Sequence, residues 1–238
     1  MDNASYTQLT RQSGLLREIQ MIAHNIANLS TTGFRREGLL FSEYVERLGG
    51  EEPSLSMATG RARQTYLTPG ALTMTGGPLD LAIEGEGFFT LQTPEGERYT
   101  RAGHFTPNRD GELVTPDGHR VLDDGGSAIF IPPDADQIAI ARDGTVSADG
   151  QPLAQIALVR PADPSSLRRE TGVLHAIDGE VEPVEMPQIL QGFLEESNVN
   201  AISEMARLIA VQRAYENGQK FLDREDERIR NVVQTLGR

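Results

Sequence analysis

Histidine, acidic and hydroxyl side chains are the groups that could carry chemistry in this 238-residue chain, because it contains no cysteine. A serine nucleophile needs a histidine that accepts its proton and an acid that orients the histidine. The four histidines, His24, His104, His119 and His175, are scattered, and no Gly-x-Ser-x-Gly elbow is present. No two of them have the spacing of a zinc-binding pair. We expect neither a catalytic triad nor a zinc site, and we interpret the histidines as surface or capping residues.

Residues 106–117 are the best candidate for a metal site. Asn108 and Asp110 match the third and fifth positions of a calcium-binding loop. Thr106 stands where such loops begin with aspartate, however, and Asp117 stands where a bidentate glutamate is needed. Strand-like flanks and two prolines favour a hairpin turn instead. The segment predicts no metal site, although a calcium-stabilised adhesin stays open as an alternative.

Two carboxylates facing each other across a cleft could hydrolyse a glycosidic bond. The chain has 35 Asp and Glu residues, so many pairs could be nominated, and Glu84, Glu86, Asp110 and Asp117 all lie in predicted turns. There is no tryptophan to form a platform for sugars. Gly85-Glu86-Gly87 lacks the third glycine and the lysine of a phosphate-binding loop. We predict that the protein is not an enzyme and has no catalytic residues, no cofactor and no metal.

The first element that could position any site is a helix covering the first 30 residues. Five apolar residues alternate spacings of four and three and so share one face: Leu15, Ile19, Ile22, Ile26 and Leu29. No proline interrupts this run, and Thr31-Thr32-Gly33 follows it. Glycine suits the left-handed conformation that often ends a helix. We predict an N-terminal assembly segment over residues 1–36.

A second helix is predicted at the other end, from Ala201 to Leu236. Its apolar residues repeat every 3.5 positions, which is the period of a coiled coil. At ~1.5 Å per residue this helix is roughly 54 Å long. Gln212, Gln219 and Asp226 fall on the apolar seam, so we expect the helix to need several neighbours. Residues 197–238 form the predicted C-terminal assembly segment.

Between the helices the pattern changes to a period of two, broken by Asp-Gly turns that favour hairpins. The fold class is therefore α+β, with long terminal helices that pair as a coiled coil around an inserted, mainly antiparallel β-rich domain. That domain is predicted over residues 76–196. Residues 37–75 are rich in glycine and polar residues, and we predict an extended connector there.

Net charge narrows the possible partners. The chain carries −13 overall, while residues 37–196 carry −16 and both ends are close to neutral. Such an acidic middle repels nucleic acid and anionic lipid, so we expect neither as a partner. No run of 18 apolar residues could cross a membrane, and residues 1–17 lack the apolar core of a cleaved secretory signal. A cytoplasmic location, or export without signal cleavage, is expected.

Several motifs together resemble the rod and hook family of bacterial flagellar axial proteins. They occur in the family's order and cover both ends and the middle: Asn25–Arg35, Leu79–Phe89, Tyr99–Phe105, Asp110–Val114, Gly192–Asn200 and Gln212–Glu216. The resemblance implies a structural subunit that leaves the cell unfolded through the flagellar type III export apparatus, without cleavage. It further implies self-assembly, with copies of itself and other rod proteins, into the periplasm-spanning rod of the basal body that drives motility.

Within that family, the short length and the opening residues favour a subunit of the proximal rod. A distal-rod subunit is the main alternative, and a peptidoglycan-acting hydrolase is a rival from another class. We expect the helices to bury their apolar stripes only in the assembly, with Asn25 and Asn28 tying neighbouring backbones together. The predicted assembly interface comprises Leu15, Ile19, Ile22, Asn25, Ile26, Asn28, Leu29, Gly33, Phe34, Val199, Ile202, Met205, Leu208, Tyr215, Leu222, Ile229 and Val233.

Overall fold

The computed structural model describes residues 2–46 and 55–236, with side chains placed for residues 7–40, 63–232 and 234–235. It divides into two compact units. The first, here called the helical unit, comprises Met1–Ala27, Glu37–Gln64 and Asn200–Arg238. The second, the β unit, comprises Asn28–Arg36 and Thr65–Val199. The α+β prediction, with a helix near each end and a β-rich middle, is confirmed.

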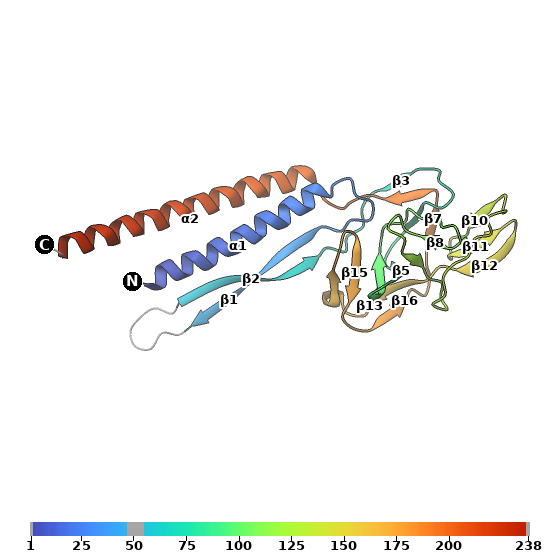
Figure 1. Cartoon of the computed structure of the whole chain (residues 1–238), viewed down its shortest axis with the longest axis horizontal. Helices are drawn as coiled ribbons and strands as arrows, with labels where there is room; N and C mark the ends of the chain where they lie inside the picture. Colours follow the sequence, from blue (N-terminus) through green and yellow to red (C-terminus); the bar gives the residue numbers. More distant parts are fainter. Residues whose placement is uncertain (1, 47–54, 237–238) are drawn as a thin grey trace. The chain divides into compact units, whose positions relative to one another are not determined.

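In the helical unit, α1 (Asp2–Ala27) and α2 (Ala201–Leu236) run side by side in opposite directions, with the β1–β2 hairpin along α1 (Figure 1). The hairpin consists of β1 (Glu37–Glu46) and β2 (Leu55–Thr65). The second helix has the bounds that the heptad pattern predicts. The first ends at Ala27, earlier than the apolar pattern suggests, because a turn begins at Asn28 and Thr31 N–H donates back to its carbonyl.

Two predicted segment boundaries differ from the structure. Residues 28–36 belong to the β unit and not to the first helix, since their hydrogen bonds run to β-unit residues. The extended connector predicted for residues 37–75 instead supplies the two paired strands β1 and β2, followed by a further short strand. The two strands pair through backbone hydrogen bonds, which do not depend on the polarity of the side chains.

The β unit contains short antiparallel strands. A nine-stranded sheet has the order β14-β15-β6-β5-β9-β8-β7, and β13 joins it by pairing with β5 and β16. The remaining strands form a β10-β11-β12 sheet and the pairs β17-β4 and β18-β3. The bounds are β3 Leu72–Met74, β4 Leu81–Ile83, β5 Phe88–Thr93, β6 Gly96–Thr100, β7 Thr106–Pro107, β8 Leu113–Val114, β9 Arg120–Val121, β10 Ile138–Ile140, β11 Thr145–Ala148, β12 Gln151–Gln155, β13 Leu158–Pro161, η1 Pro164–Ser166, β14 Leu167–Arg169, β15 Leu174–Ile177, β16 Val181–Pro183, β17 Ile189–Gln191 and β18 Phe193–Glu195.

The main apolar core is built from side chains of β4, β5, β8, β9, β10, β11, β13 and β17 and of the loops between them. A smaller cluster joins β5, β6 and β14 through Phe88, Tyr99 and Leu167. Phe89 and Phe105 meet edge to face within the main core, with ring centroids 5.2 Å apart.

Residues 106–117, which were considered above as a calcium-binding loop, form the β7–β8 hairpin. Asn108 Oδ1 accepts hydrogen bonds from the backbone N–H groups of Asp110 and Glu112, so the Asn108 side chain holds the loop in its turn.

The described residues contain no cluster of three or more metal-ligating side chains and no helix apolar and long enough to cross a bilayer. His175 is a correction to the expectation of surface histidines, because it lies fully buried in β15. Its ring packs against Phe88, with centroids 5.7 Å apart. Burial, reinforced by the positive charges of Arg169 and Arg35, lowers the pKa of His175 from 6.5 to about 3.

This buried histidine predicts acid sensitivity of the β unit. Between pH 6.5 and 3 the unfolded chain binds a proton that folded His175 excludes, so the free energy of unfolding falls as pH drops through this window. We expect a loss of about 3 kcal/mol between pH 7 and pH 4 from this group. Urea unfolding of the His175→Gln variant should lack that part of the pH dependence, whereas half-exposed His119→Gln should keep it. Equal pH slopes in the two variants would contradict the prediction.

Candidate functional site

Two buried polar clusters, one in each unit, contain the residues of the family-like motifs. In the helical unit the cluster centres on Asn25, which is fully buried near the end of α1. Its Nδ2 donates to the Glu37 carbonyl at 2.9 Å and to Glu204 Oε2 at 3.2 Å, while its Oδ1 accepts from Glu37 N–H at 3.0 Å. One amide therefore joins α1 to the first residue of β1 and to α2.

The Asn25 cluster fixes how α1 and α2 align along their length. Glu37 and Glu204 are themselves buried, so sliding the helices would leave carboxylates and amides without their partners. Further along, Arg207 Nε donates to Glu18 Oε1 at 2.9 Å, and Gln12 Nε2 donates to the Tyr215 carbonyl at 2.9 Å. Polar contacts at three levels thus set a single register for the pair, as polar seam residues do in helical bundles.

The apolar stripe of α1 packs against α2 within the same chain. Ile22 and Met21 are buried with Val211, and the half-buried residues packed around them are Leu15, Ile19, Ile26, Leu39 and Leu208. Close approach of the helices is possible at Gly218, where a Cβ atom would lie 2.3 Å from Gln12 Nε2. The structure thus differs from the expectation that these stripes are buried only in the assembly, since burial of Ile22 needs no second subunit.

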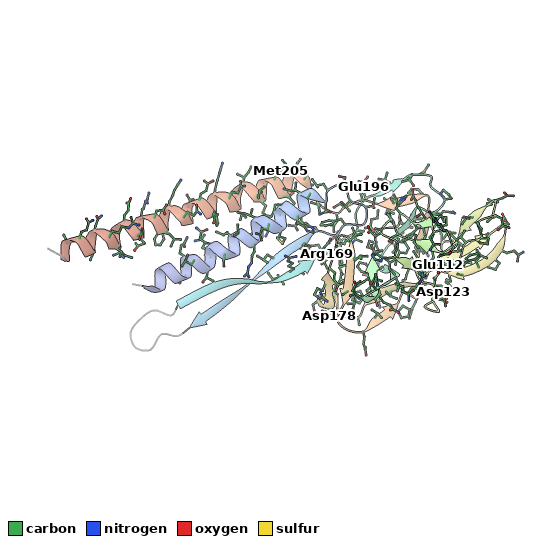
Figure 2. All side chains as sticks on the ribbon, in the orientation of Figure 1. Glu112, Asp123, Arg169, Asp178, Glu196 and Met205 are labelled. Carbon is green, nitrogen blue, oxygen red and sulfur yellow. The ribbon has the colours of Figure 1, made fainter. Side chains whose placement is uncertain are left out.

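The rest of α2 exposes apolar side chains. Ile202, Met205 and Ile229 are 80%, 58% and 47% exposed, and Met205 is labelled on α2 in Figure 2. Tyr215 and Leu222 are half-buried, and the side chain of Val233 lies outside those that the structure describes. The predicted interface set therefore divides into two groups. Some residues pack against other parts of the same chain, and others, on α2, are exposed to solvent.

In the β unit the second cluster begins at Gly33, which has a left-handed φ of +67°. A Cβ atom there would lie 2.2 Å from the Ala102 backbone nitrogen, so only glycine fits. Gly33 N–H donates to the Glu195 carbonyl at 2.7 Å. Phe34 follows, fully buried, with the Arg169 guanidinium 4.1 Å from its ring centroid. These contacts attach residues 28–36 to the strands.

Arg35, Arg101 and Glu195 form the charged centre of this cluster. Arg35 Nη1 lies 2.7 Å from Glu195 Oε1, and Arg101 Nε lies 2.7 Å from Glu195 Oε2. Arg101 also donates to the carbonyls of Ile83, Gly85 and Gly87. All three charged side chains are at most 3% exposed. Burial, and then repulsion from Arg101, lowers the pKa of Arg35 from 12.5 to about 10.

Asn198 completes the β-unit cluster. Its Oδ1 accepts from Arg36 N–H at 2.5 Å, and its Nδ2 donates to the carbonyls of Tyr66 at 3.0 Å and Thr68 at 2.7 Å. Like Asn25 in the helical unit, Asn198 joins three segments that are distant in sequence through the hydrogen bonds of its side-chain amide. The other predicted residues here, Asn28, Leu29 and Val199, are half-buried, and Asn28 Oδ1 accepts from Thr31 Oγ1 at 3.1 Å.

The predicted interface set lacks several members of both clusters, namely Arg35, Glu37, Arg101, Glu195, Asn198 and Glu204. All but Glu37 lie in or beside the motifs that carry the family resemblance, so their sequence signal is present. Their pairing could not be read from spacing, because Glu195 lies 94 residues from one guanidinium partner, Arg101, and still further along the chain from the other, Arg35. Neither cluster combines a nucleophile with a base. The arrangement joins distant segments of the chain, which is a structural task.

Comparisons with known proteins agree with a structural role for the two clusters. Residues 6–35 match the family described as flagella basal body rod protein, residues 82–148 match the flagellar hook protein FlgE/F/G D1 domain, and residues 190–235 match the flagellar basal body rod FlgEFG protein C-terminal family. The chain is 44% identical to flagellar basal-body rod protein FlgF of Caulobacter vibrioides, over 100% of this chain and 99% of that protein.

Two further relatives extend the comparison. FlgF of Mesorhizobium japonicum is 37% identical over 100% of this chain and 99% of its own length. The flagellar basal-body rod protein FlgG of Bacillus subtilis is 31% identical over 96% of this chain and 97% of its own length. The aligned regions therefore span both units and are not confined to one segment.

The Asn25 cluster predicts a large effect of one substitution. Asn25→Leu keeps the volume but removes the acceptor for Glu37 N–H and a donor to Glu204, so we expect a loss of about 2 to 4 kcal/mol in the stability of the helical unit. Urea unfolding followed by helical circular dichroism would measure it. Ser13→Ala is the control in the same helix, because the exposed Ser13 hydroxyl donates to the Thr10 carbonyl one turn away, and it should cost less than about 1 kcal/mol. A larger loss of stability in the control than in Asn25→Leu would contradict the view that Asn25 holds the helical unit together.

The β-unit cluster predicts a comparable effect at Glu195. Glu195→Gln leaves two buried guanidinium groups without a counter-charge, which should cost about 3 to 5 kcal/mol. The neighbouring Glu196→Gln is the control, since Glu196 is exposed and only accepts from Thr73 Oγ1, and its cost should stay below about 1 kcal/mol. Thermal unfolding of the two variants gives the comparison. Equal stability of the wild type and Glu195→Gln would show that the buried ion cluster does not hold the β unit together.

Proposed function

Because the chain belongs to the flagellar basal-body rod family and is a structural subunit of that rod, we propose that it occupies the proximal rod and polymerises there through its terminal helices. The observation that carries the proposal is the full-length similarity to FlgF proteins, which is 44% for the Caulobacter vibrioides protein. FlgG of the same organism is 34% identical over 94% of this chain. The difference favours the proximal-rod assignment over the distal-rod alternative.

The helical unit supports assembly through α2. Ile202, Met205 and Ile209 lie within two turns of one another and are at least half-exposed, on a helix whose other face packs on α1. Water exposure of such a stripe is unfavourable by about 25 cal/mol for each Å² of apolar surface. A neighbouring subunit that covers the stripe removes this cost. We propose that α1 and α2 become a coiled coil with helices of neighbouring subunits, in keeping with the 3.5-residue period of α2.

Further parts of the proposal concern export and location. We propose that the chain reaches the rod unfolded, through the flagellar type III export apparatus and without signal cleavage, as the family resemblance implies. Its partners are then copies of itself and other rod proteins, and its location is the basal body. We also propose that it has no enzymatic role. A peptidoglycan hydrolase is not favoured, since Glu195 is engaged with arginine and backbone N–H groups and Glu204 accepts from the Asn25 side-chain amide.

The exposed stripe gives the test of this proposal. Ile22→Asp is a poor probe, because Ile22 is buried within the chain and its loss would unfold the helical unit. Ile202→Asp places a charge at an 80% exposed position, so the monomer should keep its melting temperature while motility is lost in a complementation assay. Ser203→Asp adds the same charge next to the stripe and should retain motility. Normal swimming with Ile202→Asp would contradict assembly through this face of α2.

A further inference from the structure

The edge strands of the β unit differ in how their outer backbone groups are protected. An unpaired sheet edge attracts further strands, and proteins block such an edge with proline, with charge or with a covering group. Three edge strands contain a proline, which is Pro107 in β7, Pro152 in β12 and Pro183 in β16. The edge strand β14 carries Arg168 and Arg169. These four edges are therefore blocked by their own residues.

Other edges are covered by neighbouring segments of the same unit. The Gln191 side chain accepts from Ile140 N–H at 3.1 Å and donates to the Ile138 carbonyl at 3.1 Å, so it caps the outer edge of β10. The Glu195 carbonyl in β18 accepts from Gly33 N–H at 2.7 Å. Both β4 and β17 donate backbone hydrogen bonds to carbonyls outside their own pair. Each of these edges is thus occupied within the subunit.

Among the β-unit edge strands that the structure describes, β3 is the exception (labelled in Figure 1). It pairs with β18 on one side, and Thr75 N–H donates to the Gly192 carbonyl at 2.8 Å at the end of this pairing. Because backbone groups alternate sides along a strand, Leu72 and Met74 direct theirs to the open side. All residues over 71–76 are exposed, and β3 contains neither proline nor a charged residue. This edge is open and unprotected.

The exposed side chains of β3 are apolar, and their surroundings in the sequence carry no charge. Met74 is 74% exposed and Leu72 is 37% exposed, and the two lie on one face because side chains alternate along a strand. No Asp, Glu, Lys or Arg occurs in residues 64–79. The edge therefore fits an extended, uncharged strand with apolar side chains at alternate positions. β3 itself is such a strand, so the edge is complementary to itself.

From these observations we infer that β3 is a docking edge for a second copy of the chain, whose own β3 pairs with it antiparallel about a two-fold axis at Thr73. In this register Leu72 of each copy lies opposite Met74 of the other, so four apolar side chains cluster on one face. The contact joins the same surface of both copies, and it closes as a dimer instead of propagating.

The dimer belongs to the free subunit, and the inference does not depend on the proposed rod assembly. So short a strand buries less than the roughly 1,200 Å² of a stable complex. The association is therefore weak, with a dissociation constant of about 1 mM. A covalent trap is suited to detecting such a weak dimer.

Disulfide trapping tests the inference, because the chain has no cysteine of its own. On the two-fold axis residue 73 faces its counterpart as a non-hydrogen-bonded pair, with Cα atoms about 4.5 Å apart, a separation that a disulfide spans. We expect full-length Thr73→Cys to form a covalent dimer under mild oxidation about tenfold faster than Met186→Cys, an 81% exposed control in the same unit. Equal rates would overturn the inference.

A charge placed on the edge gives a second test in the Thr73→Cys background. Met74→Lys should abolish the fast cross-linking, because an edge lysine opposes strand addition, whereas Met186→Lys should preserve it. Both methionines are exposed, so neither lysine should change the melting temperature. Fast cross-linking that survives Met74→Lys would overturn the inference. Ile202→Asp should leave the rate unchanged, and loss of the cross-link in that variant would assign the association to α2 instead of β3.

Discussion

The carboxylate of Glu195, held between Arg35 and Arg101, is the interaction on which the β unit depends. The three residues come from segments that are far apart in the sequence, and all are removed from water. A buried ion pair need not add net stability, but breaking it is costly because it leaves a charge without its partner. The β unit can therefore fold only with the Thr31–Arg36 segment packed against β6 and β18. Asn25 imposes the same kind of constraint on α1, β1 and α2.

These two constraints leave some apolar residues packed within the chain and others exposed to water. The Ile22 stripe of α1 is used within the chain, against Val211 and Leu208, so the helical unit has a core before any neighbour arrives. The stripe at Ile202 and Met205 is left outside. A rod subunit needs both, because a preformed unit presents its contact surface at lower entropic cost than an unfolded segment does. The structural role in the rod follows from the family membership.

The sequence predicts the broad fold and only part of the site. Long-period apolar patterns identify α2 with its observed bounds, and alternating residues with Asp-Gly turns identify the antiparallel middle, because both are local signals. The pairing of β1 with β2 has no such signal, because the apolar residues of β1 stand next to one another, at 39–41 and 44–45, instead of alternating with polar ones. Asn25, Gly33 and Phe34 are recognisable from their motif, whereas the link from Arg35 to Glu195 depends on tertiary packing. His175 is misjudged for the same reason, since its burial is decided by β6 and β14.

Hydrogen exchange of the free chain and of assembled rods tests the central claim most directly, namely that two buried polar clusters order the subunit before it assembles. The account predicts that backbone amides around Asn25 in α1 and around Glu204–Val211 in α2 are protected in the free chain, with little further gain in the rod. Amides of β6 and β18 should behave likewise. Rapid exchange of α1 and α2 in the free chain, with protection only after assembly, would contradict the account.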